Sequence, residues 1–227
     1  MVSHLVSPNA IIGISQACNF PEEIQTSPIV AFHNRLNTEK IVVLSPSLVV
    51  GVGLSGNLNT AIFDRPLILE YPTSIADFYE QLAHLGNRLG VDATPHIATL
   101  SEASRVPTPN VSPRTLILIS ASPFIAAGPS TFMSDLISHA GGRNCLTTPV
   151  SFPRLSVEQI IALNPDVIVT TSPSTHQQIL DHSLLSVLPA VRANRVISTI
   201  DPDILLRSTP RFPQAIHALY RFFHDTP

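Results

Sequence analysis

The sequence of 227 residues predicts an α/β fold made of two Rossmann-like lobes with parallel-rich sheets. Three observations support this prediction. Short apolar runs alternate with helical patterns, most of these runs are continuously apolar and do not alternate with polar residues, and one helix–turn–strand segment occurs twice. Runs that are apolar throughout are typical of parallel strands covered on both faces. Their alternation with helices indicates an α/β architecture rather than separate helical and sheet domains.

Six short runs predict the strands. Each is rich in β-branched residues and is bounded by proline, glycine or serine, which favour turns. The predicted strands span 11–15, 48–52, 67–71, 115–120, 166–171 and 195–199. The helical patterns between them span 38–44, 74–89, 130–140, 156–163 and 211–223. This order of elements is that of repeated strand–helix–strand units.

The segment 92–113 differs from the rest of the chain because it is polar and ends in three closely spaced prolines. We expect a short helix at 94–105 followed by extended chain, since a proline disfavours the helical conformation of the residue before it. The segment therefore marks a boundary between two lobes. We expect an N-terminal α/β lobe at 1–91, a linker helix with a proline-rich connection at 92–113, and a C-terminal α/β lobe at 114–227.

An internal repeat supports this division. The segment 38–50 aligns without gaps on 157–169, and Glu39 falls on Glu158. Each copy predicts a short helix with a glutamate in its first turn, a proline turn and a buried strand. Two similar lobes favour a ligand cleft between them, because ligand sites occur preferentially at domain interfaces.

Composition argues against several classes of function. Charged residues make up 13% of the chain and the net charge is −3, which leaves no broad cationic surface for nucleic acid. No apolar run approaches the ~20 residues that a membrane-spanning helix needs. The nine histidines and the two cysteines, Cys18 and Cys145, lack metal-ligand spacings, so we expect no metal site and no other cofactor.

One motif supports an alternative function as a dinucleotide-binding enzyme. The run GVGLSG, from Gly51 to Gly56, follows a predicted strand, and Glu70 ends the next one. A dinucleotide site needs glycines for a tight turn against the pyrophosphate and a carboxylate for the ribose. The helix after the glycines would be short, because Pro66 closes it.

Four residues of the second half are candidate ligand contacts. Phe124 and Phe152 lie in loops flanked by proline, where an aromatic side chain is either a local plug or a platform for a ligand. Asp203 and Arg207 follow the last predicted strand, four residues apart. One helical turn would bring them together as a surface ion pair or aim them at the polar groups of a ligand.

Three segments of the second half resemble a known family. They read PFIAAGPSTFMSDLISHAGGRNCL, FPRLSVEQIIALNPDVIVTT and DPDILLRSTPRFPQAIHAL. They look like the C-terminal lobe of periplasmic cobalamin- and iron-siderophore-binding proteins, the substrate-binding components of ABC importers. Weaker similarity in GISQACNFPEEIQTSPIV and NTEKIVVLSPSLVV extends the resemblance from Ile11 to the C-terminus.

The resemblance implies a binding protein rather than an enzyme. In the family, two α/β lobes are joined by a single linker helix, and the ligand lies in the cleft between them. We therefore expect a metal chelate as the ligand, either cobalamin-like or a ferric siderophore, and an ABC permease dimer as the partner. The helix at 94–105 would be the linker, although it is shorter than the family's usual one. We expect a monomer.

The resemblance also assigns roles to single residues. Phe124 and Phe152 match positions that touch cobalamin in its binders, and Asp203 and Arg207 match polar ligand contacts. The two glutamates of the internal repeat match the carboxylates with which the family docks on its permease, one from each lobe.

The sequence departs from the family in its first half. Ala17, His33 and Val52 stand where cobalamin binders place aromatic residues, and the chain has no tryptophan, so a siderophore, haem or another chelate stays open. Only VSHLVSPNA stands where the family has a first strand and helix, so we expect an incomplete N-terminal lobe. The resemblance implies a periplasmic protein, but the start of the chain lacks a signal-peptide pattern, which leaves the cytoplasm open. A relative that has lost ligand binding is a further alternative.

Overall fold

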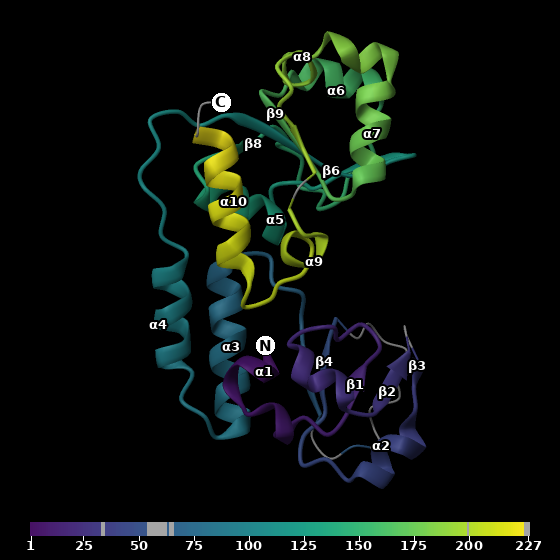
Figure 1. Ribbon diagram of the computed structural model, residues 1–227, viewed down its shortest axis with the longest axis vertical. Coiled ribbons are helices and arrows are strands. Elements are labelled where there is room, and N and C mark those ends of the chain that lie inside the picture. The colour runs from purple at the N-terminus through teal and green to yellow at the C-terminus, as the bar shows by residue number, and fades with distance from the viewer. Residues whose placement is uncertain (33–34, 54–62, 64–65, 199, 225–227) are drawn as a thin grey trace. The chain divides into compact units, whose positions relative to one another are not determined.

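The computed structural model describes residues 1–32, 35–53, 63, 66–198 and 200–224 (Figure 1). The chain forms two compact units. The N-terminal unit consists of Met1–Tyr71 and Tyr79–Thr99, and the C-terminal unit consists of Pro72–Phe78 and Leu100–Pro227. Helices α3 (Ile75–Leu89) and α4 (Thr94–Ala103) contribute residues to both units.

The N-terminal unit contains two small sheets within its described residues. Its strands are β1 (Ile14–Ser15), β2 (Ile29–Phe32), β3 (Arg35–Leu36), β4 (Val50–Val52) and β5 (Leu67–Leu69). Strands β1 and β2 are parallel, β3 runs antiparallel to β2, and β4 and β5 form a separate parallel pair. The other elements are α1 (Val2–Leu5), α2 (Thr38–Leu44) and 3₁₀ helices at Pro8–Ala10 and Glu22–Thr26.

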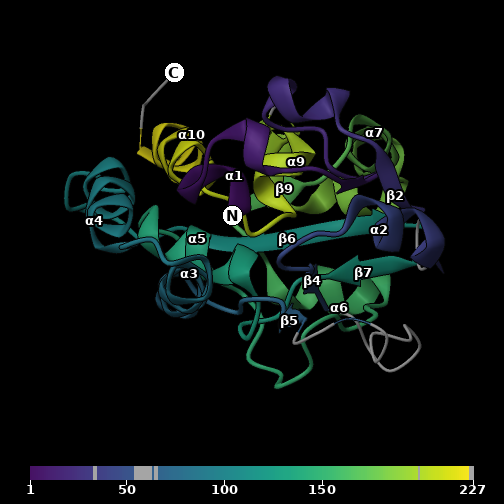
Figure 2. The same cartoon turned by 90° about the horizontal axis from the view of Figure 1, so that it is seen from below.

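The C-terminal unit is built on one sheet, in which described strands follow the order β10–β9–β6–β7 and β8 pairs with β6. Figure 2 shows β6 running through the middle of this unit. The strands are β6 (Arg114–Ala121), β7 (Phe124–Ala126), β8 (Arg143–Asn144), β9 (Val167–Thr170) and β10 (Val196–Ile197). All the pairs are parallel except β6–β7. This arrangement confirms the predicted α/β class with parallel-rich sheets.

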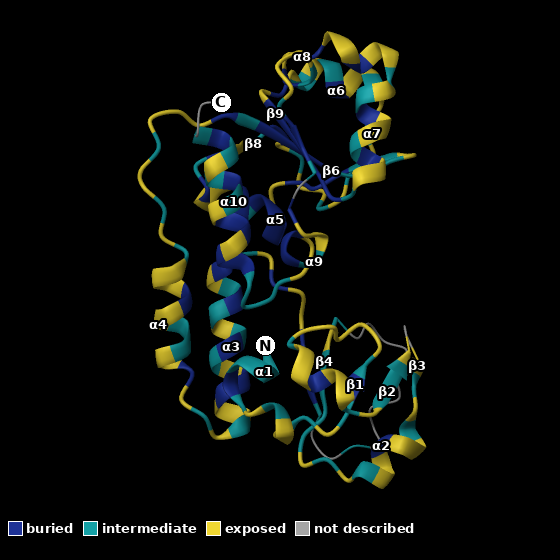
Figure 3. Cartoon of the chain, viewed as in Figure 1, coloured by how far each residue is buried: buried dark blue, intermediate teal, exposed yellow. Residues whose placement is uncertain are grey.

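Helices cover both faces of this sheet. They are α5 (Phe132–His139), α6 (Val157–Leu163), α7 (Pro173–Asp181), α8 (Pro189–Arg192), α9 (Pro202–Leu205) and α10 (Phe212–His224), with a 3₁₀ helix at Ser183–Val187. On one face Leu116, Leu118 and Ile168 form a core with residues of α6, α7 and α8. The alternate strand residues Ile117 and Val169 point to the opposite face and are fully buried as well. Figure 3 shows β9 and much of α5 as buried, and β6 as buried in its middle and partly buried at its ends.

The predicted elements are all present, some of them shorter than expected. The six predicted strands correspond to β1, β4, β5, β6, β9 and β10, and the helical patterns correspond to α2, α3, α5, α6 and α10. The short helix expected at 94–105 is α4. Strands β2 and β7 and helix α7 lie where no element was predicted. Among the described residues, no helix has the length and apolarity needed to cross a membrane.

Candidate functional site

The predicted polar pair lies at α9, the short helix that follows β10: Asp203 is in the helix, and Arg207 comes two residues after its end. Arg207 Nε is 3.0 Å from Asp203 Oδ1, and 42% and 28% of the respective side chains are exposed. The start of α9 is capped by Asp201, whose Oδ1 accepts a hydrogen bond from the backbone N–H of Asp203 at 2.8 Å. The four-residue spacing thus brings the two charges together, and both remain within reach of solvent.

Phe124 begins β7, the strand that runs antiparallel to β6. Its side chain is partly buried and packs against the core between the sheet and helices α6 and α7. The Phe124 ring also lies 5.8 Å from the imidazole of His182, at an interplanar angle of 59°. Much of this aromatic surface is therefore used in packing within the C-terminal unit.

Phe152 lies in the loop beside β7, and 54% of its surface is exposed. The loop runs antiparallel to β7: the N–H of Leu155 donates to the carbonyl of Phe124 at 3.1 Å, and the N–H of Ala126 donates to that of Pro153 at 3.0 Å. Phe124 is thus paired with Leu155. Because Leu155 comes three residues after Phe152, Phe152 lies about 10 Å further along the extended chain from the position that faces Phe124. The two aromatic side chains do not form one stacked platform.

The two glutamates of the internal repeat occupy equivalent places. Glu39 lies in the first turn of α2, and Glu158 lies in the first turn of α6. Both side chains are exposed, and neither forms an ion pair in the part of the chain that the structure describes. Each copy of the repeat therefore presents one exposed carboxylate at a helix start, where the helix dipole favours negative charge.

The two helix starts are capped by different means. Asn37 caps α2 by accepting a hydrogen bond from Lys40 N at 2.9 Å. Ser156 caps α6 by accepting from Gln159 N at 3.2 Å, and Gln159 Oε1 accepts from Ser156 N at 2.8 Å, which completes a capping box. The Ser156 side chain, and then the backbone N–H of Glu158, also lower the pKa of the Glu158 carboxyl by hydrogen bonding to its charged form.

The motif of the dinucleotide alternative is only partly described. Gly51 lies in β4, Gly53 follows it with φ of 58°, and the N–H of Gly53 donates to Leu69 O at 2.8 Å. The rest of the motif, through Gly56, lies outside the described residues, as does His33. Glu70 is exposed at the end of β5. The strands around the motif are therefore present.

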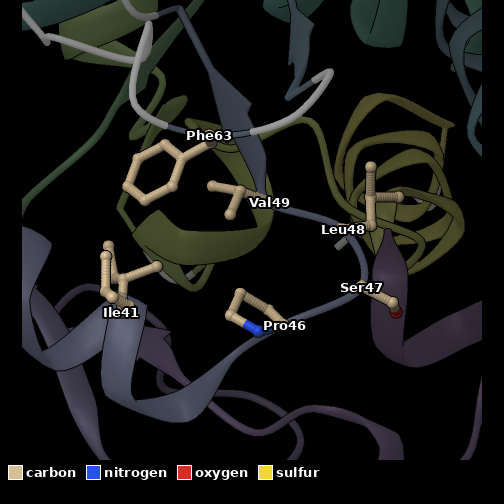
Figure 4. A pocket seen from close by; sticks show the side chains of 7 residues that line it. Ile41, Pro46, Ser47, Leu48, Val49 and Phe63 are labelled. Atoms are coloured by element: carbon tan, nitrogen blue, oxygen red, sulfur yellow. The ribbon is translucent and has the colours of Figure 1, made fainter.

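The N-terminal unit contains an apolar hollow of about 380 Å³ that sequence reasoning missed. Its walls come from α2 and from the chain that leads to β4, and Figure 4 shows Ile41, Pro46, Val49 and Phe63 around it. The full lining is Ile41, Val42, Pro46, Ser47, Leu48, Val49 and Phe63. None of these side chains is charged, and Ser47 supplies the one polar side chain of the lining, so the hollow offers no charged group for a chelate. The signal in the sequence was the apolar run from Ile41 to Leu44 on a short helix, followed by a second apolar run from Leu48.

Metal ligands are not gathered into a site in the described residues, where no three His, Cys, Asp or Glu side chains stand together. Cys18 is exposed and Cys145 is buried, and the structure forms no disulfide from them. Burial raises the pKa of the Cys145 thiol to about 11, so this side chain behaves as a small apolar core residue.

Comparison with known proteins decides between the two functional classes. The family model described as periplasmic binding protein matches residues 5–203. The chain belongs to the periplasmic binding protein family. The relatives in this family are substrate-binding proteins of ABC transporters and not enzymes, which confirms the predicted class and disfavours the dinucleotide-binding enzyme.

Individual relatives are distant but cover most of this chain. The ABC transporter substrate-binding lipoprotein YvrC of Bacillus subtilis is 23% identical over 226 residues, which cover 92% of this chain and 71% of YvrC. A cobalamin-binding protein of Halobacterium salinarum is 25% identical over 96% of this chain, which spans 64% of that protein. The solved structure of the periplasmic haem-binding protein RhuT from Roseiflexus sp. RS-1 matches with a TM-score of 0.73 at 27% identity, over 94% of this chain and 89% of RhuT.

Proposed function

We propose that this protein is the substrate-binding component of an ABC importer, and that it captures a metal chelate and delivers it to a permease dimer. The observation that carries the proposal is the family match over residues 5–203, which includes parts of both units. The relatives support the class of ligand, because one binds cobalamin and another binds haem. Since they include a lipoprotein and a periplasmic protein, we place this protein outside the cytoplasmic membrane.

The charges of Asp203 and Arg207 favour a ligand with amide groups at its edge. A primary amide offers an oxygen to the guanidinium of Arg207 and N–H donors to the carboxylate of Asp203, so one amide can bind the whole pair. The carboxylates of haem would attract Arg207 but would meet the like charge of Asp203. Cobalamin, with its peripheral amides, and ferric hydroxamates therefore fit this pair better than haem does.

Phe152 is the aromatic residue better placed to contact a flat apolar ligand. More than half of its surface is exposed, whereas the Phe124 ring is partly covered by the core and by His182. Burial of an exposed aromatic side chain against a macrocycle is favourable in proportion to the apolar area removed from water. We assign the larger stacking contribution to Phe152 and a smaller one to Phe124.

Calorimetry on the purified protein tests the ligand class, with cyanocobalamin, a ferric hydroxamate, haemin and NAD compared under the same conditions. We expect cyanocobalamin to bind most tightly, and Arg207→Met with Asp203→Asn to weaken it by about tenfold or more through loss of charge-assisted hydrogen bonds. Arg105→Met with Glu102→Gln is the matched control, because that pair is highly exposed at the C-terminal end of α4.

The other outcomes have distinct meanings. Preference for haemin would contradict the argument from the charges of Asp203 and Arg207. Binding of NAD alone would favour the enzyme that uses Gly51–Gly56 and Glu70. Absence of binding to a cooperatively folded protein would favour a relative that has lost its ligand.

Docking on the permease is assigned to Glu39 and Glu158, which would pair with arginines of the partner. The double variant Glu39→Arg with Glu158→Arg is expected to keep the wild-type Kd for the ligand and to lose uptake in cells that carry the permease. The control, Glu23→Arg with Glu102→Arg, makes the same change of charge at other exposed positions. Normal uptake by the first double variant would exclude these residues from docking. We propose that the protein acts as a monomer without a cofactor.

A further inference from the structure

Two ion pairs bridge the segment from Asp201 to Arg211, and in sequence the residues of one pair lie between those of the other. The outer pair joins Arg211 Nη1 to Asp201 Oδ2 at 3.5 Å, and the inner pair joins Arg207 Nε to Asp203 Oδ1 at 3.0 Å. Arg211 is the most buried of the four side chains, with 19% of its surface exposed. Water therefore screens the charge of Arg211 less than it screens the other three.

Asp201 connects the outer pair to the inner one. Its Oδ1 caps α9 by accepting a hydrogen bond from Asp203 N, while its Oδ2 faces Arg211. Helix α9 has four residues, which is too few for a stable isolated helix, because the first turn costs conformational entropy that only further turns recover. The position of Asp203 therefore depends on what holds Asp201.

Arg211 is held by the core of the C-terminal unit. Its carbonyl accepts a hydrogen bond from Gln214 N at 3.0 Å, where α10 begins. The next residue, Phe212, is fully buried, and its ring lies 5.4 Å from that of Phe78 and 5.9 Å from that of Phe132. The guanidinium of Arg211 thus extends from a backbone fixed by aromatic packing, whereas Asp203 and Arg207 lie at a partly exposed surface.

We propose that Arg211 is a positioning residue for the ligand site: it fixes Asp201 and, through the cap of α9, holds Asp203 and Arg207 ready for the polar edge of the ligand. Only the last step rests on the proposed function. The ordering of α9 by Arg211 takes place without a ligand and can be measured without one.

Three variants and one control separate this role from general support of the fold. Arg211→Met removes the charge and keeps much of the side-chain length, and Arg211→Lys keeps the charge. Asp201→Asn weakens the ion pair but keeps the helix cap, because asparagine caps as well as aspartate. If Arg211→Met does not fold, Asp201→Asn still tests the role of the ion pair between Asp201 and Arg211. Arg105→Met is the matched control, since Arg105 pairs with Glu102 at 3.0 Å on an exposed surface.

The first measurement is amide hydrogen exchange in the ligand-free protein. We expect Arg211→Met and Asp201→Asn to speed exchange of peptides covering 201–207 by about tenfold, with unchanged exchange in β6 and α10. Arg211→Lys should restore most of the protection, and Arg105→Met should have no effect on 201–207. Unchanged exchange at 201–207, or acceleration that also includes β6 and α10 to the same extent, would overturn the proposal.

The second measurement is the Kd for cyanocobalamin. We expect it to rise about tenfold in Arg211→Met and in Asp201→Asn, and no further in the double variant, because both changes remove the same pair. Wild-type affinity in both single variants would overturn the positioning role. If the wild-type protein binds none of the probes, the proposed function fails, and hydrogen exchange still decides whether Arg211 orders α9.

Discussion

The two copies of the repeated segment have the same local structure but very different surroundings. Helix α2 leads into β4 in the N-terminal unit, and α6 leads into β9 in the C-terminal unit. Both helices have seven residues, a side-chain cap at the start and a left-handed residue at the end, Ser45 in one and Asn164 in the other. All four residues of β9 are buried, whereas no residue of β4 is.

Tertiary packing accounts for this difference. Strand β9 lies between β6 and β10 and is covered by helices on both faces, but β4 pairs with β5 alone among the described strands. On the helices, Ile161 packs against the core while its counterpart Val42 is 58% exposed. The similar local sequences of the two copies therefore give similar helices and turns. The burial of each copy depends on elements from other parts of the chain that pack against it.

The largest expected effect comes from the buried isoleucine at the same place in both helices. Ile160→Ala in α6 should lower the free energy of unfolding by about 4 kcal/mol, because Ile160 is fully buried in a close-packed core. Ile41→Ala in α2 should cost about 2 kcal/mol, because Ile41 borders an existing hollow that leaves fewer contacts to lose. Urea unfolding of both variants measures the difference, and equal losses would contradict the comparison.

The helix caps should show a smaller difference. Ser156→Ala removes a cap that belongs to a reciprocal capping box, and we expect a loss of about 1.5 kcal/mol. Asn37→Ala removes a single cap hydrogen bond and should cost about 1 kcal/mol. Thermal unfolding, with Ser186→Ala as a control for a serine outside both caps, tests the order. A larger loss for Asn37→Ala would reverse it.

At the C-terminal ends of the two helices, substitution by glycine should stabilise the protein or leave its stability unchanged, in contrast to the losses expected at the caps. Ser45 and Asn164 have φ of 47° and 44°, a conformation that favours glycine and that asparagine tolerates better than serine. Ser45→Gly should therefore stabilise the protein by about 0.5 kcal/mol, and Asn164→Gly should have little effect. Urea unfolding compares the two variants, and destabilisation by Ser45→Gly would show that its hydroxyl, which donates to Val42 O at 3.0 Å, matters more than backbone strain.

The smallest effect concerns acid stability at the start of α6. The pKa of Glu158 is lowered below its ordinary value of 4.5 by hydrogen bonds in the folded state. Its carboxylate therefore adds stability above the unfolded pKa, and this contribution disappears as the pH falls through the lower folded pKa. Glu158→Gln should reduce the loss of stability between neutral pH and about pH 3. Denaturation at several pH values measures this, and an unchanged pH profile would contradict it.

Much of the local structure was predicted because it depends on nearby residues. The span predicted for α2, 38–44, is the observed one, because a glutamate in the first turn and a proline turn after the last apolar residue are local signals. Helix α7 was missed although Ser172 and Pro173 form a cap and a first-turn proline, a start signal visible in the sequence. Strand β7 was missed because a three-residue run becomes a strand only by pairing with β6.

One part of the candidate site, the contact between Asp203 and Arg207, was predictable because it also depends on nearby residues. Asp203 and Arg207 are four residues apart, so one helical turn brings them into contact whatever surrounds them. The pairing of Asp201 with Arg211 depends on where the chain returns to begin α10. The partial burial of Phe124 depends on helices that follow it by about 30 residues or more, and no periodicity in the sequence around Phe124 reports their position.

The sequence by itself determined the α/β class, the duplicated helix–turn–strand segment with its first-turn glutamates, and the contact between Asp203 and Arg207. Helix caps, turns and pairs of residues four positions apart act over a few residues only. Only the tertiary structure decided which copy is buried, which aromatic side chain stays exposed and which arginine anchors α9. Those outcomes depend on contacts between residues far apart in the chain, and such contacts exist only after the sheet and its covering helices have assembled.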